Sequence, residues 1–207
     1  MDDFAARVDH TVLGPETTAA DVRRVAAEAA DYGMNACVPP CYLDAAVEAA
    51  PGVRLVTVVG FPHGQHAPET LATEATAARD AGADELDLVG NMGHLLGGDA
   101  DAFRAGVARV VDATSLPVKV IVQAPRLDEQ TLRTACEQAA AAGADYVKTA
   151  TGFGPGGATV GDVRVMAEYL PVKAAGGIRD RAQAERLLDA GAARIGTSAG
   201  VALLTAA

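Results

Sequence analysis

The sequence predicts an α/β fold of the (β/α)₈ type, in which a closed sheet of eight parallel strands is surrounded by helices. Short apolar runs alternate with alanine-rich helical patterns along the 207 residues, and such alternation indicates a parallel sheet. An Ala-Gly-Ala phrase recurs at residues 81–83, 142–144 and 190–192, each time between a helical pattern and a β-prone run. Eight such units favour a single TIM barrel over residues 1–207. An open doubly wound sheet is the alternative, but no Gly-x-Gly-x-x-Gly follows the first run.

The strands are expected in the short runs rich in valine, leucine and isoleucine, because runs of this length between turn residues are typical of buried strands. In chain order they lie near residues 8–12, 35–38, 55–60, 85–89, 118–122, 146–149, 172–175 and 194–196.

A helical pattern follows each run, the last being a short one from about Ala199. Helix starts are indicated by Thr18 with Asp21, by Thr70 with Thr73 and Glu74, and by Asp128 and Asp180 at N-cap positions. Helix ends are indicated by glycines that can take the left-handed conformation, namely Gly33, Gly82, Gly143 and Gly191.

Composition and charge exclude several classes of protein. The net charge of −10 and the pI near 4.7 argue against a nucleic-acid-binding surface, which would carry a basic patch. No 18-residue apolar run and no signal peptide are found, so we expect a cytoplasmic protein that does not span a membrane. An alanine-rich barrel without tryptophan can associate through its helix faces, and we expect a homo-oligomer, either a dimer or a tetramer.

Lysine is scarce, since Lys119, Lys148 and Lys173 are the only lysines beside 14 arginines, and each follows a valine in an apolar run. In a (β/α)₈ barrel the chemistry lies at the carboxyl ends of the strands. Lys148 and Lys173 lie near the ends of two neighbouring strands, whereas Lys119 begins its strand and is expected to be structural. A buried amine beside a second ammonium loses its proton more readily and can attack a carbonyl. The alternative is that these lysines only form ion pairs with Asp87 or Asp9.

Glycine clusters follow the last three strands, at residues 152–157, 176–177 and 196–200. Loops at this end of a barrel often bind phosphate through backbone N–H groups, and glycine permits the close approach. Together with Arg179, the clusters favour a phosphorylated substrate, although tight turns alone would also explain glycine. His63, His66 and His94 lie in predicted loops, and the Cys37–Cys41 pair lacks metal-site spacing, so we expect no metal and no cofactor.

Motifs spread over nearly the whole chain, in the same order, resemble those of the deoxyribose-phosphate aldolases. They are residues 9–11 (Asp-His-Thr), 37–42 (Cys-Val-Pro-Pro-Cys-Tyr), 59–64 (Val-Gly-Phe-Pro-His-Gly), 83–87 (Ala-Asp-Glu-Leu-Asp), 147–153 (Val-Lys-Thr-Ala-Thr-Gly-Phe), 156–159 (Gly-Gly-Ala-Thr), 172–179 (Val-Lys-Ala-Ala-Gly-Gly-Ile-Arg) and 194–198 (Arg-Ile-Gly-Thr-Ser).

This resemblance implies a class I aldolase that needs no cofactor and forms a Schiff base on Lys148. Lys173 would lower the pKa of Lys148, and Asp87 would transfer protons. Substrate-binding positions implied by the resemblance are Asp9, Thr11, Cys37, Thr151, Gly152, Gly176, Gly177, Arg179, Gly196 and Ser198. The reaction expected is reversible cleavage of 2-deoxyribose 5-phosphate to glyceraldehyde 3-phosphate and acetaldehyde.

Three departures from the family pattern bear on substrate preference. Gln123 stands where the family usually has glutamate, and Ala150 and Ala199 stand where it often has serine. Two alternatives therefore stay open: a Schiff-base aldolase for another phosphorylated aldol, and a catalytically silent barrel that binds a sugar phosphate.

Overall fold

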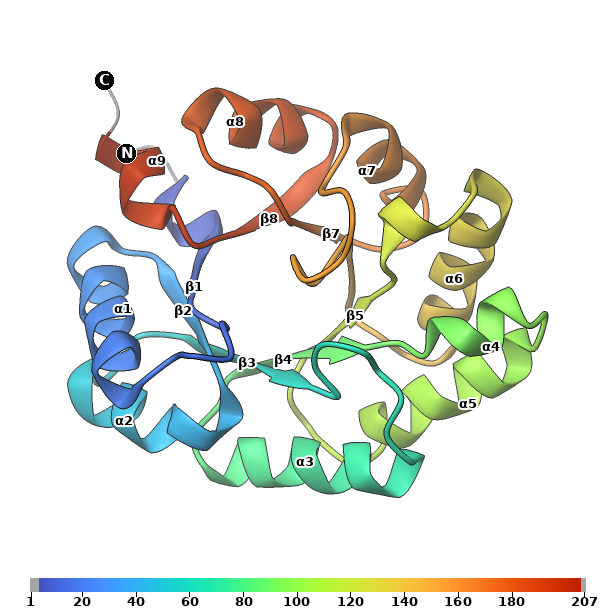
Figure 1. Cartoon of the computed structure of the whole chain (residues 1–207), viewed down its shortest axis with the longest axis horizontal. Helices are drawn as coiled ribbons and strands as arrows, with labels where there is room; N and C mark the ends of the chain where they lie inside the picture. Colours follow the sequence, from blue (N-terminus) through green and yellow to red (C-terminus); the bar gives the residue numbers. More distant parts are fainter. Residues whose placement is uncertain (1–3, 206–207) are drawn as a thin grey trace.

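Eight parallel strands form a closed barrel, each paired with the next in the chain and the last paired with the first (Figure 1). The structure is a computed structural model that describes residues 4–205. The strands are β1 (Val8–Thr11), β2 (Asn35–Val38), β3 (Leu55–Val59), β4 (Glu85–Val89), β5 (Val118–Ile121), β6 (Tyr146–Lys148), β7 (Val172–Ala175) and β8 (Ala192–Thr197). The predicted barrel is thus confirmed, and the open sheet is wrong. The largest difference in a strand boundary is at β8, which begins two residues earlier than predicted.

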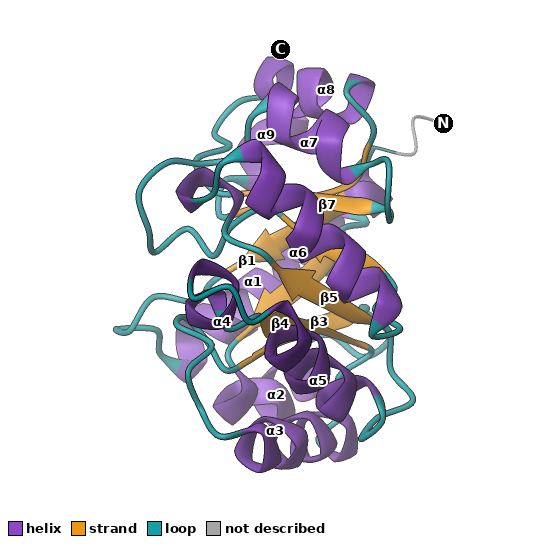
Figure 2. Ribbon diagram, turned by 90° about the vertical axis from the view of Figure 1, so that its right-hand side faces the viewer, coloured by secondary structure: helices purple, strands orange, loops and turns teal. Residues whose placement is uncertain are grey.

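Helices surround the sheet, so the strands occupy the middle of the molecule in the side view of Figure 2. The α-helices are α1 (Ala19–Tyr32), α2 (Leu43–Ala49), α3 (Pro68–Asp80), α4 (Met92–Leu96), α5 (Ala100–Val111), α6 (Glu129–Ala141), α7 (Val160–Met166), α8 (Arg181–Asp189) and α9 (Gly200–Thr205). Three short 3₁₀ turns are η1 (Ala5–Arg7), η2 (Pro40–Tyr42) and η3 (Ala124–Arg126). No helix within residues 4–205 is long and apolar enough to cross a membrane.

The helix-start signals are confirmed at three of four places. Thr18 and Asp21 form a capping box at α1, and the side chains of Asp128 and Asp180 cap α6 and α8. The signal at Thr70 was wrong, because α3 begins two residues earlier, at Pro68. Proline is well suited to the first turn of a helix, since its missing N–H would have no partner there.

The helix-end signals are also confirmed. Gly33, Gly82, Gly143 and Gly191 have φ angles of 71°, 94°, 84° and 111°, all in the left-handed region. Each glycine therefore turns the chain from a helix on the outside into the next strand of the barrel.

Strand register places charged side chains next to one another inside the barrel. Lys148 on β6 is paired directly with Lys173 on β7, and Asp87 on β4 is paired with Lys119 on β5. All four side chains are buried. Buried charges are tolerated only where opposite charges and hydrogen bonds compensate them, so these pairings determine the properties of the barrel interior.

Candidate active site

Lys148 and Lys173 meet at a single carboxylate oxygen. Asp87 Oδ2 accepts a hydrogen bond from Lys148 Nζ at 2.8 Å and from Lys173 Nζ at 2.7 Å. The two amines therefore lie side by side, as their positions on neighbouring strands predict. Lys148 is 3% exposed and lines a cavity, whereas Lys173 is fully buried. A ligand in the cavity can thus reach Lys148 directly.

Lys119 completes a group of three lysines around Asp87. Its Nζ donates to Asp87 Oδ1 at 3.1 Å and forms an ion pair with Glu85 Oε2 at 2.6 Å. Glu85 is the first residue of β4, so Lys119 lies at the end of the barrel away from the carboxyl ends of the strands. The structure therefore places Lys119 where the sequence predicts it.

The protonation states of Asp87 and Lys173 follow from this pairing. Burial alone would raise the pKa of Asp87, but the charges of Lys119, Lys148 and Lys173 outweigh burial and hold that pKa well below its usual range. Burial alone would lower the pKa of Lys173, but Asp87 and Asp9 outweigh it and raise that pKa. At neutral pH, Asp87 is a carboxylate and Lys173 is an ammonium.

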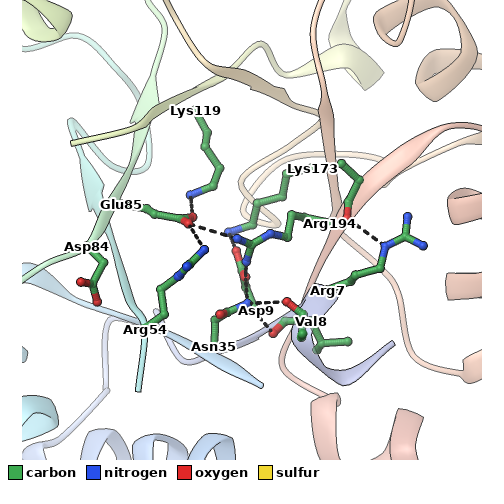
Figure 3. Close-up of polar contacts among 12 residues, drawn as sticks. Arg7, Val8, Asp9, Asn35, Arg54, Asp84, Glu85, Lys119, Lys173 and Arg194 are labelled. Atoms are coloured by element: carbon green, nitrogen blue, oxygen red, sulfur yellow. Dashed lines mark hydrogen bonds and ion pairs between the residues drawn. The ribbon is translucent and has the colours of Figure 1, made fainter. Parts of the chain in front are cut away.

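A second layer of charges supports Lys173 from below (Figure 3). Asp9 Oδ2 forms an ion pair with Lys173 Nζ at 2.5 Å, and Asp9 Oδ1 accepts hydrogen bonds from Arg194 and Asn35, both at 3.0 Å. Arg194 also bonds Glu85 at 3.0 Å, and so links Asp9 to the carboxylate that holds Lys119. The net effect of these cations is to lower the pKa of Asp9 although its burial would raise it.

Sequence reasoning missed Asn35, Glu85 and Arg194 as members of this network. Each is explained by strand geometry: Glu85 is two residues before Asp87 and so points to the same face, while Asn35 and Arg194 are register partners of Asp9 and Lys173. Alternation of side chains along the predicted strands was the signal that could have identified them.

The carboxyl ends of the strands surround a cavity of about 350 Å³. The predicted positions that line it are Thr11, Lys148, Thr151, Gly152, Gly176, Gly177, Arg179, Gly196 and Ser198. Asp9 and Cys37 do not line it, since both side chains are fully buried in the barrel interior. Burial also raises the pKa of the Cys37 thiol, which keeps that sulfur protonated.

Apolar residues that the sequence did not indicate form part of the cavity wall, namely Val12, Leu13, Phe153 and Ile178. Phe153 is 48% exposed, and its ring packs edge to face against Phe61 at a centroid distance of 5.3 Å. This aromatic pair joins the loops after β3 and β6 at the side of the cavity. The wall therefore combines apolar surface with a few polar groups, as small-molecule sites commonly do.

Glycines in β8 and in the loops after β6 and β7 make room for the site. A Cβ on Gly196 would lie 3.0 Å from Lys173 Cε, so a larger residue would displace the buried lysine. Gly176 has a φ of 100°, and its carbonyl would lie 2.4 Å from a Cβ on Gly157. These contacts explain why β8 and the loop after β6 need glycine at positions 196 and 157. Arg179 is exposed at the same end of the barrel and can contribute positive charge to an anion.

The histidines set aside in the sequence do not gather at the lysines. His66 and His94 lie instead near a small pocket between β4 and helices α3 and α5. Within residues 4–205, no group of three or more His, Cys, Asp or Glu side chains is arranged to hold a metal ion.

The charge network predicts that acid destabilises the fold through Asp87. Because the pKa of Asp87 is lower in the folded chain, its stabilising contribution is complete above about pH 4, the value of an unfolded aspartate, and is lost as the pH falls through the folded pKa. Asp87→Asn should reduce the free energy of unfolding by about 3–5 kcal/mol at pH 7, since three lysines lose their shared partner.

Urea unfolding of the unchanged chain and of Asp87→Asn, from pH 7 down to pH 3, measures this contribution. The difference between the two proteins should be constant above about pH 4 and narrow below it. A difference that stays constant to pH 3 would show that Asp87 does not carry the effect.

Comparison with known proteins gives matches over almost the whole chain. A family model described as DeoC/LacD family aldolase matches residues 4–207. A protein of Natronomonas pharaonis named deoxyribose-phosphate aldolase is 63% identical over 98% of this chain and 94% of its own length. A protein of the same name from Haloquadratum walsbyi is 52% identical over 99% of this chain and 95% of its own.

Solved structures agree with these matches. One described as a tetrameric deoxyribose phosphate aldolase from Aeropyrum pernix is 39% identical, with a TM-score of 0.90 over 98% of this chain and 89% of that one. An aldolase called QR15 is 34% identical, with a TM-score of 0.94 over 98% of this chain and 95% of that one.

Proposed function

Since this chain belongs to the DeoC/LacD family of aldolases, we propose that it reversibly cleaves 2-deoxyribose 5-phosphate to glyceraldehyde 3-phosphate and acetaldehyde. Relatives at 63% and 52% identity are named deoxyribose-phosphate aldolase, which supports this substrate. The observation that carries the mechanism is the pair of buried lysines at one oxygen of Asp87, with Lys148 open to the cavity.

The arrangement of the buried charges supports Lys148 as the reacting amine. Within residues 4–205, three buried carboxylates (Asp9, Glu85 and Asp87) face four buried cations (Lys119, Lys148, Lys173 and Arg194). Arg54 also bonds Glu85, but its side chain is half exposed and water screens its charge. Among these four cations, it is Lys148 that lines the cavity. Lys148 is therefore the group best placed to attack a carbonyl.

The proposed reaction begins at the amine of Lys148. Its Nζ adds to the C1 aldehyde, and loss of water gives an iminium that accepts the electrons of the C2–C3 bond. Cleavage of that bond, with loss of the C3 hydroxyl proton, releases glyceraldehyde 3-phosphate and leaves an enamine on Lys148. Protonation of the enamine at C2 and addition of water release acetaldehyde and the free amine. Asp87 and Lys173 are placed to exchange the protons through a water molecule.

The loops after β7 and β8 are proposed to hold the phosphate, through backbone N–H groups near Gly176, Gly177, Gly196 and Ser198 and the charge of Arg179. We also propose a role in deoxyribose catabolism and self-association of the chain, the latter because the Aeropyrum pernix relative is described as tetrameric.

Trapping with borohydride tests the mechanism. Incubation with acetaldehyde and sodium borohydride should leave an ethyl group on Lys148, found by mass spectrometry in tryptic peptides that cover residues 134–164. Turnover of 2-deoxyribose 5-phosphate, unphosphorylated deoxyribose and a ketose phosphate should be measured beside it. An adduct only on Lys119 or Lys173 would contradict the mechanism, and preference for the ketose phosphate would contradict the substrate.

A further inference from the structure

Gln123 has an unusual backbone conformation at the edge of the proposed active site. It lies two residues after the end of β5 and has φ 51° and ψ 46°. Within residues 4–205 it is the one residue other than glycine with a positive φ. The left-handed region costs such a residue about 1 kcal/mol or more. Hydrogen bonds on both sides hold it there, from Val122 N to Lys148 O at 3.0 Å and from Ala124 N to Thr149 O at 2.8 Å.

This conformation brings the Gln123 amide against Thr151, three residues after Lys148. Gln123 Nε2 donates to Thr151 Oγ1 at 3.1 Å, and Gln123 Oε1 accepts from Thr151 N at 3.4 Å. The backbone N–H of Thr151 can only donate, so the amide oxygen must face it and the amide nitrogen must face the hydroxyl. The orientation of the amide is therefore determined by its neighbour.

Thr151 Oγ1 also accepts a hydrogen bond from Phe153 N at 3.2 Å. Two N–H donors thus occupy both acceptor positions of the hydroxyl, and its own hydrogen must point elsewhere. Among the groups of residues 4–205, none accepts that hydrogen, and Thr151 lines the cavity. The hydroxyl is therefore available as a donor to a bound molecule.

We propose that Gln123 is a positioning residue that makes Thr151 a hydrogen-bond donor to an oxygen atom of the substrate. The proposal rests on the aldolase function proposed above and concerns the same cavity. In this chain the amide supplies an N–H toward Thr151 Oγ1 and an oxygen toward Thr151 N, a pair of contacts that the glutamate usual at this position in the family cannot supply as a carboxylate. A carboxylate has two acceptors, so the Thr151 hydroxyl would turn toward it and be lost to the substrate.

The test compares kcat and KM of Gln123→Glu, Thr151→Val and the double variant with those of the unchanged chain, from pH 5 to pH 8. Gln123→Glu should lower kcat/KM about tenfold at pH 8, the effect of one lost hydrogen bond. Its activity relative to the unchanged chain should recover toward pH 5, because a protonated glutamic acid can again donate to Thr151. In the Thr151→Val background, Gln123→Glu should have no further effect, since the hydroxyl that it acts through is absent.

Gln130→Glu, on the exposed face of α6, is the matched control for an added negative charge and should leave kcat/KM and its pH profile unchanged. Thermal unfolding checks that each variant folds. If Gln123→Glu does not fold, Gln123→Met and Thr151→Ser replace it. Gln123→Met should lose activity at every pH, whereas Thr151→Ser should retain activity.

The substrate oxygen is identified by repeating the assay with unphosphorylated deoxyribose. An equal loss with both substrates places the acceptor on the sugar, whereas a loss confined to the phosphorylated substrate places it on the phosphate. Two results would overturn the role of Gln123 while the aldolase function stands. One is full activity of Gln123→Glu, and the other is a loss of kcat/KM that does not change with pH and adds to the loss in Thr151→Val. No turnover by the unchanged chain would overturn the aldolase function and this proposal with it.

Discussion

Replacement of Lys148 by arginine is expected to lower kcat/KM for 2-deoxyribose 5-phosphate by at least about three orders of magnitude. Arginine stays protonated and cannot form an imine, so the covalent route is closed. It keeps a positively charged hydrogen-bond donor beside Asp87 Oδ2, where Lys148 Nζ donates at 2.8 Å. The variant thus separates loss of the nucleophile from loss of the ion pair.

A coupled assay of glyceraldehyde 3-phosphate release measures this loss, and acetaldehyde with borohydride should label no lysine of the variant. Thermal unfolding shows whether the larger side chain is accommodated at the cavity edge. Lys148→Met is the companion variant, because it removes both the amine and the charge and should be equally inactive. Normal turnover by either protein would refute Lys148 as the nucleophile.

The barrel and its lysine pair could be predicted because both depend on local patterns. Glycines such as Gly82 and Gly143 mark where each helix turns back into a strand, so the number and order of the strands follow from the sequence. Once the strands are counted, Lys148 and Lys173 must be on neighbouring strands, and their register in the barrel agrees.

The supporting network could not be predicted in the same way. Glu85 begins β4 and Arg194 lies in the first half of β8, and charged residues usually face solvent. They are buried here because Glu85 binds Lys119 and Arg194 binds Asp9, contacts that exist only when strands distant in the chain close into the barrel. Likewise, the contact of Gln123 with Thr151 depends on a left-handed backbone at Gln123. The sequence does not indicate this conformation, because the residue is not glycine.

Lys173 provides the sharpest test of how the barrel controls Lys148. With Lys173 present, three buried carboxylates face four cations, and the second ammonium lies beside Lys148 at Asp87 Oδ2. Lys173→Met leaves three cations and three carboxylates and removes that neighbouring charge from Lys148. We expect trapping by acetaldehyde and turnover to fall about a hundredfold near pH 7 and to recover as the pH rises.

Asp9→Asn makes the opposite change in the same layer, since it removes a carboxylate that contacts Lys173 and Arg194. The excess of positive charge around Lys148 then grows, and trapping should be faster at low pH than in the unchanged chain. The rate of trapping against pH, measured for the three proteins, should therefore move to higher pH for Lys173→Met and to lower pH for Asp9→Asn. Equal losses in the rate of trapping, without a shift of the pH profile, would mean that these residues only support the fold. Movement in opposite directions would show that the charge balance of the barrel sets the reactivity of Lys148.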